Sequence, residues 1–190
     1  MASAFGFVPV DGIGDGLSTG RRIMCFIPST DATAVYLNDF VTLTTNVDPV
    51  TGCPVVTRSA AADAAVLGSV VAIDQVRGLT ASTSVLGRNY RPASTGMYVY
   101  VVVARDTLYK TTVNATLTLS DIGGNVFNLV ATAGDTATGV SKMAIDVSSK
   151  ASSGKQFRIV EFLNDPSMVI GATTAASGSV VLVTCNLPTL

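Results

Sequence analysis

The stretch Gly96-Met97-Tyr98-Val99-Tyr100-Val101-Val102-Val103 decides the fold. Its tyrosines and valines carry aromatic and β-branched side chains, which favour extended strands. Alternate residues of a strand point to opposite faces, so Val99 and Val101 lie on one face and Tyr98 and Tyr100 on the other. Both faces are therefore apolar, and an exposed edge of this composition would aggregate. The stretch predicts a central strand that is covered on both faces.

Composition around this strand also favours β-structure. The chain has 190 residues, of which 48% are hydrophobic and 13% charged, so it is long enough for one ordinary domain with a sizeable core. The apolar residues come in short bursts between Ser, Thr and Gly, which is typical of all-β proteins. Glu161 is the one glutamate of the sequence, although exposed helix faces are rich in Glu and Lys. The shortage of charge indicates that a partner covers part of the surface.

Turn signals divide the rest of the chain into about ten short strands. Besides the central strand, the apolar or alternating segments are residues 23–27, 35–37, 40–44, 55–57, 68–74, 108–113, 115–119, 126–130, 157–163 and 180–185. We expect an antiparallel β-barrel or sandwich, formed by a single β-barrel-type domain over residues 21–190. Alanine-rich residues 59–66 fit a short helix and an irregular loop equally well.

Residues 1–20 are expected to form an extended N-terminal arm. They are rich in glycine, which opposes a stable independent element, yet they contain apolar side chains that need burial. We expect the arm to dock on a partner, so that its deletion would leave the stability of the barrel nearly unchanged. The alternative is that the arm pairs as an edge strand of its own barrel. The residues expected to contact the partner are Phe5, Phe7, Val8, Val10, Arg21 and Arg22.

The residue types argue against catalysis. The sequence has no histidine, which removes the commonest general base and metal ligand. Most aspartates stand beside Gly, Asn or Pro, where they form turns. Asp11-x-x-x-Asp15-Gly16 lacks the third-position ligand and the glutamate of a calcium loop. We therefore expect no catalytic, metal or cofactor site. The remaining alternative, a hydrolase that uses aspartates alone, would be found by an activity screen with and without divalent metal.

Charge, hydropathy and cysteine content limit the classes of partner and the cellular compartment that we expect for this chain. The formal net charge is −1, which gives no electrostatic footprint for nucleic acid. No apolar run approaches the roughly 20 residues of a membrane helix. Cys25 and Cys185 lie in apolar runs and are expected in the core, whereas Cys53 lies in a turn-rich loop. The first residues lack the features of a signal peptide, so we expect synthesis in the cytoplasm.

Several short motifs follow one another along nearly the whole chain. They are Phe5-Gly6-Phe7-Val8-Pro9-Val10, Leu37-Asn38-Asp39-Phe40-Val41, Gly68-Ser69-Val70-Val71, Tyr90-Arg91, Tyr98-Val99-Tyr100-Val101, Asp106-Thr107-Leu108-Tyr109, Gly139-Val140-Ser141 and Phe157-Arg158-Ile159. In this order and spacing the chain resembles the small head-decoration (cement) proteins of short-tailed bacteriophages. It departs from the family pattern at Asn186-Leu187-Pro188, where the family often has Asn-x-His.

The resemblance implies a β-barrel protein, commonly a homotrimer, on the outer capsid surface of the virion. Such a protein binds the major capsid protein and bridges its subunits against the pressure of the packaged DNA. It has no small-molecule substrate and is not an enzyme. A glycine-flexed apolar arm suits this role, because an arm that orders on binding can wrap a large surface of a partner. The alternative is another virion surface module or a receptor-binding β module.

Overall fold

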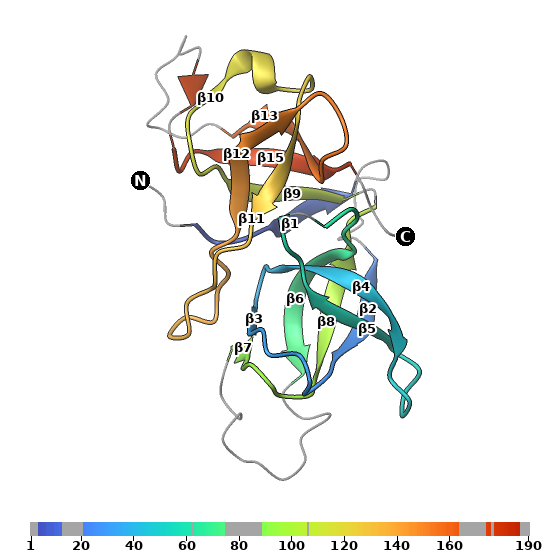
Figure 1. Cartoon of the computed structure of the whole chain (residues 1–190). Coiled ribbons are helices and arrows are strands. Elements are labelled where there is room, and N and C mark those ends of the chain that lie inside the picture. The colour runs from blue at the N-terminus through green and yellow to red at the C-terminus, as the bar shows by residue number, and fades with distance from the viewer. Residues whose placement is uncertain are drawn as a thin grey trace.

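A computed structural model of the chain describes residues 4–12, 21–61, 63–74, 89–105, 107–163, 174–175 and 177–186. Its strands form two lobes, a closed barrel in the lower half of Figure 1 and a curled sheet in the upper half. The expected all-β class, a barrel or sandwich built from antiparallel strands, is confirmed. Eleven of the described strands have five or more residues, close to the expected ten.

The barrel lobe closes in the order β2-β5-β4-β6-β8. These strands are β2 (Arg22–Ile27), β4 (Phe40–Val47), β5 (Pro54–Arg58), β6 (Gly68–Asp74) and β8 (Met97–Val103). Four of the five pairings are antiparallel, and the barrel is closed by a short parallel contact between β2 and β5, where Phe26 lies opposite Val55. Each strand therefore has a neighbour on both sides, which leaves this lobe without a free edge.

Strand β8 is the central strand that the sequence predicts. It pairs with β2 on one side and with β6 on the other. Val99 and Val101 are fully buried inside the barrel, and Val102 is fully buried on the opposite face. There the hydroxyl of Tyr109 donates a hydrogen bond to the Val102 carbonyl oxygen over 2.9 Å. Gly68 lies so close to this strand that a Cβ would stand 1.9 Å from the same oxygen, so only glycine fits.

The sheet lobe has six antiparallel strands in the order β1-β9-β15-β13-β11-β12. They are β1 (Val8–Gly12), β9 (Thr107–Thr112), β11 (Val126–Val130), β12 (Ala144–Ala151), β13 (Phe157–Phe162) and β15 (Val180–Cys185). The sheet curls until β12 meets the end of β9, where the Asn114 amide nitrogen donates to the Ile145 carbonyl over 3.0 Å. Asn114 also accepts a hydrogen bond from the Val147 amide and donates to Asp146, so that it joins β12 to the segment just after β9.

Two pairs of short strands lie outside the barrel and the curled sheet. β3 (Val35–Tyr36) pairs with β7 (Tyr90–Arg91), and β10 (Leu117–Thr118) pairs with β14 (Thr174–Ala175). A single 3₁₀ turn, η2 (Leu119–Asp121), is the helical element of the described residues. The alanine-rich segment resolves as a loop, in which the Ala60 amide donates to the Asp63 carboxylate over 2.8 Å.

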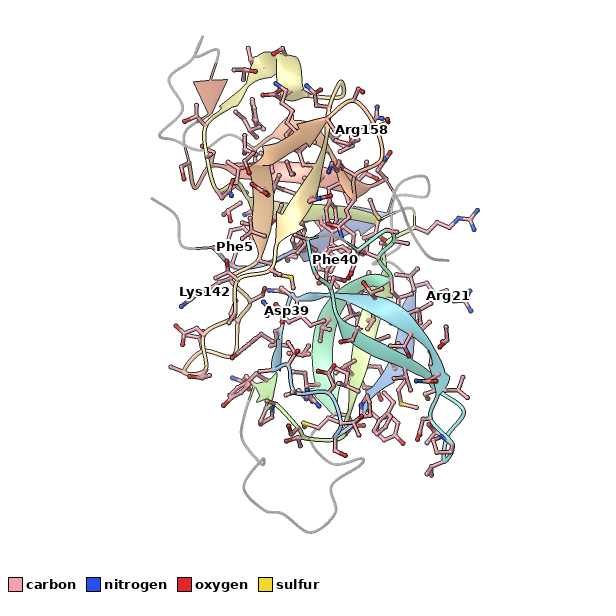
Figure 2. All side chains as sticks on the ribbon, viewed as in Figure 1. Phe5, Arg21, Asp39, Phe40, Lys142 and Arg158 are labelled. Atoms are coloured by element: carbon pink, nitrogen blue, oxygen red, sulfur yellow. The ribbon has the colours of Figure 1, made fainter. Side chains whose placement is uncertain are left out.

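The two lobes meet at a cluster of aromatic rings. The Phe7 ring lies 4.8 Å from that of Phe40 and 4.7 Å from that of Phe157, between centroids. The Ser69 hydroxyl of the barrel donates to the Phe7 carbonyl oxygen over 2.6 Å. Figure 2 shows Phe40 at the level where the lobes touch. The core of the sheet lobe therefore includes residues from the barrel strands.

The prediction of a separate arm over residues 1–20 is wrong for residues 4–12. β1 pairs with β9 over Val8 to Gly12, and Phe7 is fully buried in the core. This is the alternative in which the segment serves as an edge strand of its own molecule, although the strand joins the sheet lobe rather than the barrel. Burial of a phenylalanine ring stabilises the fold by about 1.5–3 kcal/mol, which offsets the entropy lost by ordering the neighbouring glycine. Residues 13–20, and with them the arm boundary, lie outside the described residues.

Candidate functional site

The six residues predicted to bind a partner have different environments. Phe7 is fully buried, so the prediction that it contacts a partner is wrong. Phe5 and Val8 are half-buried, and the Lys110 ammonium lies 5.9 Å from the Phe5 ring centroid. Val10 is 50% exposed. Val10 is therefore the apolar residue of this segment that a partner can reach most easily.

Strand β1 forms one edge of the curled sheet. Pro9 has no amide hydrogen, and a register shift between Pro9 and Asp11 interrupts the pairing with β9. Both features weaken an edge strand as a template for further strand pairing. The edge strand β1 is therefore a poor template for a regular ladder of backbone hydrogen bonds to a further strand.

Exposed arginines lie beside the end of this edge strand. Arg21 and Arg22 are exposed at the start of β2, and Arg105 is exposed in the turn between β8 and β9. The Val103 amide donates to the Arg21 carbonyl over 2.9 Å, and Gly12 at the end of β1 pairs with Thr107 just after that turn. Arg21 projects from the molecule on the right of Figure 2. We call Val10, Arg21, Arg22 and Arg105 the arginine surface.

The tip of the β4–β5 hairpin, residues 47–53, is a second exposed feature. Val47 is 65% exposed and Val50 is 85% exposed, although Asp48 between them is buried. The Asp48 carboxylate accepts hydrogen bonds from the Thr51 hydroxyl, from the Tyr98 hydroxyl at 2.7 Å and from the Thr51 amide at 3.0 Å. The bonds from Thr51 and Tyr98 hold the pKa of the Asp48 carboxyl below its usual value. The tip is not among the predicted partner-binding residues, although the sequence signals it by two valines, Val47 and Val50, that flank an Asp-Pro turn.

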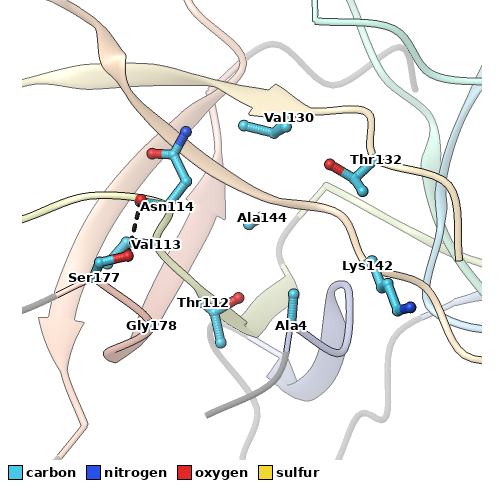
Figure 3. A pocket seen from close by; sticks show the side chains of 10 residues that line it. All are labelled: Ala4, Thr112, Val113, Asn114, Val130, Thr132, Lys142, Ala144, Ser177 and Gly178. Atoms are coloured by element: carbon cyan, nitrogen blue, oxygen red, sulfur yellow. Dashed lines mark hydrogen bonds between the residues drawn. The ribbon is translucent and has the colours of Figure 1, made fainter. Parts of the chain in front are cut away.

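A shallow hollow of about 310 Å³ lies on the sheet lobe (Figure 3). Its lining is mostly apolar, and the wall residues are Ala4, Thr112, Val113, Asn114, Val130, Thr132, Lys142, Ala144, Ser177 and Gly178. The Ser177 hydroxyl donates to the Asn114 carbonyl oxygen over 2.9 Å. The Lys142 ammonium lies 3.6 Å from an Asp135 carboxylate oxygen. These polar groups are therefore already partnered at the rim.

A buried ion pair joins the barrel to the loop that precedes β12. Arg58 Nε lies 3.0 Å from Asp39 Oδ2, and both side chains are almost inaccessible to solvent. The Arg58 guanidinium also donates to the Thr132 carbonyl oxygen. Burial raises the pKa of the Asp39 carboxyl to about 6, although Arg58 opposes the shift. The interpretation of aspartates as turn residues missed this role of Asp39.

A second buried arginine fixes the opposite end of the barrel. The Arg91 side chain is fully buried and donates to the carbonyl oxygens of Thr95, Thr33 and Pro28 over 2.6, 2.6 and 2.7 Å. It also donates to the Asp31 carbonyl oxygen over 2.8 Å. Because its guanidinium is buried and donates hydrogen bonds to these four loop carbonyls, Arg91 is a structural residue.

The cysteines follow the sequence prediction in part. Cys25 is fully buried in the barrel core, and burial raises the pKa of its thiol to about 12. Cys185 is half-buried against the core of the sheet lobe, and Cys53 is half-buried at the hairpin tip. Within the described residues no group of three or more Cys, Asp or Glu side chains is placed to hold a metal ion. No helix of the described part of the chain is long and apolar enough to cross a membrane.

Comparison with known proteins gives no relative. No protein-family model, curated protein or solved structure matches this chain.

Proposed function

We propose that this chain is a structural protein of a bacteriophage virion that binds the outside of the capsid and stabilises contacts between major capsid protein subunits. The observation that carries the proposal is the arginine surface, where Val10 is exposed on the edge strand β1 and Arg21 and Arg22 are exposed where β2 begins. Exposed arginines offer bidentate, charge-assisted hydrogen bonds to carboxylates of a partner protein. The resemblance of the sequence motifs to cement proteins supplies the identity of that partner.

The proposal includes self-association into a homo-oligomer, with a trimer favoured. Only 13% of the residues are charged, and several large apolar side chains are exposed on one copy. Closed symmetric oligomers are the usual way to cover such side chains. Light scattering at micromolar concentration should give a mass of about three chains, and a monomer of 19.5 kDa would contradict this part of the proposal.

Co-sedimentation with undecorated capsids of the same virus tests the capsid-binding surface. We expect Arg22→Glu and Val10→Asp each to weaken binding at least about tenfold, because each places a carboxylate in the contact. The matched control is Val160→Asp, which places the same carboxylate at an exposed valine of β13, away from the arginine surface. Wild-type-like binding by both test variants would overturn the surface, and failure of the wild-type protein to bind would overturn the function.

A further inference from the structure

The hairpin tip presents an apolar side chain that the fold does not use. Val50 is the most exposed of the large apolar side chains in the described part of the chain, at 85%, and its neighbours Val47 and Pro49 are exposed as well. The hairpin extends away from the barrel lobe, on the right of Figure 1. An isolated exposed valine is ordinary, but two valines and a proline at one projecting turn form an apolar knob.

The knob is held in one conformation before any partner binds. The buried Asp48 carboxylate accepts bonds from Thr51 and from the Tyr98 hydroxyl of the central strand. The backbone closes the same turn, because the Asp48 amide donates to the Cys53 carbonyl over 2.8 Å and the Gly52 amide donates to the Asp48 carbonyl over 2.8 Å. A pre-formed contact loses little conformational freedom on binding, which favours association.

The hollow on the sheet lobe has the chemistry that this knob requires. Its volume of about 310 Å³ is at the lower end of the range of roughly 300–1,000 Å³ for ligand pockets, so it suits a few aliphatic side chains better than a larger ligand. Ala4, Val130 and Ala144 supply apolar walls. The polar groups of Asn114, Ser177 and Lys142 are engaged with neighbours. The Thr112 hydroxyl has no hydrogen-bond partner but is buried within the wall, so it presents no accessible polar group to a guest.

We propose that the hairpin tip of one copy inserts Val50 into the hollow of a second copy. Lys142, in the wall of the hollow, lies on the left of Figure 2, whereas the β4–β5 hairpin projects on the right of Figure 1, which has the same view, so one copy cannot fill its own hollow. Asp48 is the only charged residue of the segment from Leu43 to Thr57, which disfavours binding to an anionic membrane, and the segment has no aromatic anchor. The second copy is the occupant whose matching surface this chain itself supplies.

Such a contact is head-to-tail, because each copy uses two different surfaces. A head-to-tail contact forms a closed ring if its rotation closes and an open filament if it does not. The inference rests on the proposed self-association and is independent of capsid binding. It names the residues that two neighbouring copies contribute to one contact.

Sedimentation of purified variants is the first test. Val50→Asp would place a carboxylate in the apolar hollow, and we expect it to raise the dissociation constant of the oligomer by about thirtyfold. Val160→Asp, an exposed valine 43% accessible on β13, is the matched control and should behave like the wild type. A monomeric wild-type protein would contradict both the self-association and this contact. An oligomer that Val50→Asp leaves intact would overturn this contact alone.

Disulfide trapping assigns the two sides of the contact. In a Cys53→Ser background, one preparation carries Val50→Cys and another carries Thr132→Cys, at the rim of the hollow. We expect mild oxidation to give cross-linked dimers in the mixture and not in either preparation alone. A control mixture of Val160→Cys with Thr132→Cys should stay uncross-linked. If Val50→Asp dissociates the oligomer but the mixture shows no specific cross-link, the hollow is not the receptor and the proposal fails.

Discussion

The barrel lobe and the sheet lobe are both built from short strands, but their cores are assembled differently. The barrel core consists of small and aliphatic side chains, including Cys25, Val41, Val70, Val99 and Val101, all from residues 23–101. The sheet core is rich in aromatic rings and draws residues from Phe7 to Val183. The barrel is therefore a local unit, whereas the sheet lobe needs both ends of the chain.

The core of the sheet lobe depends on residues of the barrel lobe, but the core of the barrel lobe contains no residue of the curled sheet. Three members of the sheet core, Phe40, Val66 and Ala104, belong to the barrel strands or to the segments that adjoin them. The barrel core contains no residue of the six strands of the curled sheet. Loss of the barrel should therefore unfold the sheet lobe, while loss of the sheet lobe should leave the barrel folded.

Val101→Asp should have the largest effect, because it places an unpaired carboxylate inside the closed barrel. Val101 is fully buried on the central strand, and burial of an isolated charge destabilises a protein by several kcal/mol. We expect loss of more than about 4 kcal/mol and simultaneous unfolding of both lobes. Denaturant unfolding followed by far-UV circular dichroism checks this. A soluble variant of near wild-type stability would show that β8 is not an interior strand.

Phe7→Ala should weaken the sheet lobe and spare the barrel. The ring is fully buried between Phe40 and Phe157, so its removal should cost about 3–5 kcal/mol. Deletion of residues 1–20 should also weaken the sheet lobe, whereas the sequence predicted that the β-barrel-type domain of residues 21–190 would keep nearly all of its stability without the arm. The half-buried Phe5 is the matched control, and Phe5→Ala should cost clearly less.

Amide hydrogen exchange distinguishes the lobes in this variant. We expect faster exchange in β9, β11 and β15 of Phe7→Ala, with protection in β2, β6 and β8 retained. Equal loss of protection in both lobes would show that they unfold as one unit.

The buried ion pair of Asp39 and Arg58 in the barrel lobe should make stability depend on pH. Burial raises the Asp39 pKa from 3.8 to about 6 in the folded protein, so the folded state binds this proton more tightly than the unfolded state. The contribution is fully present below about pH 4 and is lost as the pH rises through about 6, by up to about 3 kcal/mol. The comparison of wild type with Asp39→Asn between pH 4 and 7 isolates the effect, because other carboxyls titrate in both proteins. A difference in stability that does not change with pH would contradict this account.

The contact between Lys110 and Phe5 should contribute least. The ammonium lies 5.9 Å from the ring centroid near the surface, where a cation–π contact is worth about 0.5–1 kcal/mol. Lys110→Met, which keeps the aliphatic stem, should lower the unfolding free energy by no more than this. Thermal unfolding at low and high salt measures it, and a loss of several kcal/mol would mean that β1 is held chiefly by this contact.

The sequence predicted the strands whose patterns are strongly apolar. Residues 68–74, 126–130 and 180–185 form β6, β11 and β15 with the expected bounds, because continuous apolar or β-branched runs have few other stable conformations. β12 was missed, since its sequence from Ala144 to Ala151 contains aspartate, serines and a lysine. That strand is held by its pairing with β11 and by its hydrogen bonds with Asn114. The local composition of residues 144–151 reveals neither of these contacts.

The candidate site was less predictable than the fold. Val10, Arg21 and Arg22 are exposed and their contact with a partner stays a prediction, but Phe7 belongs to the core. An apolar residue in a glycine-rich segment needs burial, and the sequence does not say whether its own core or a partner supplies it. The same limit applies to Asp39, which lies between β3 and β4 and whose ionic partner, Arg58, lies nineteen residues away at the end of β5.

The composition of intact virions tests the central claim most directly. Virions purified from infected cells should contain this chain in a fixed ratio to the major capsid protein, and protease added from outside should remove it while the capsid protein stays intact. Quantitative mass spectrometry before and after the protease treatment gives both results. A chain that is absent from purified virions, or that is present only inside the protected shell, would contradict the proposed role on the outer capsid surface.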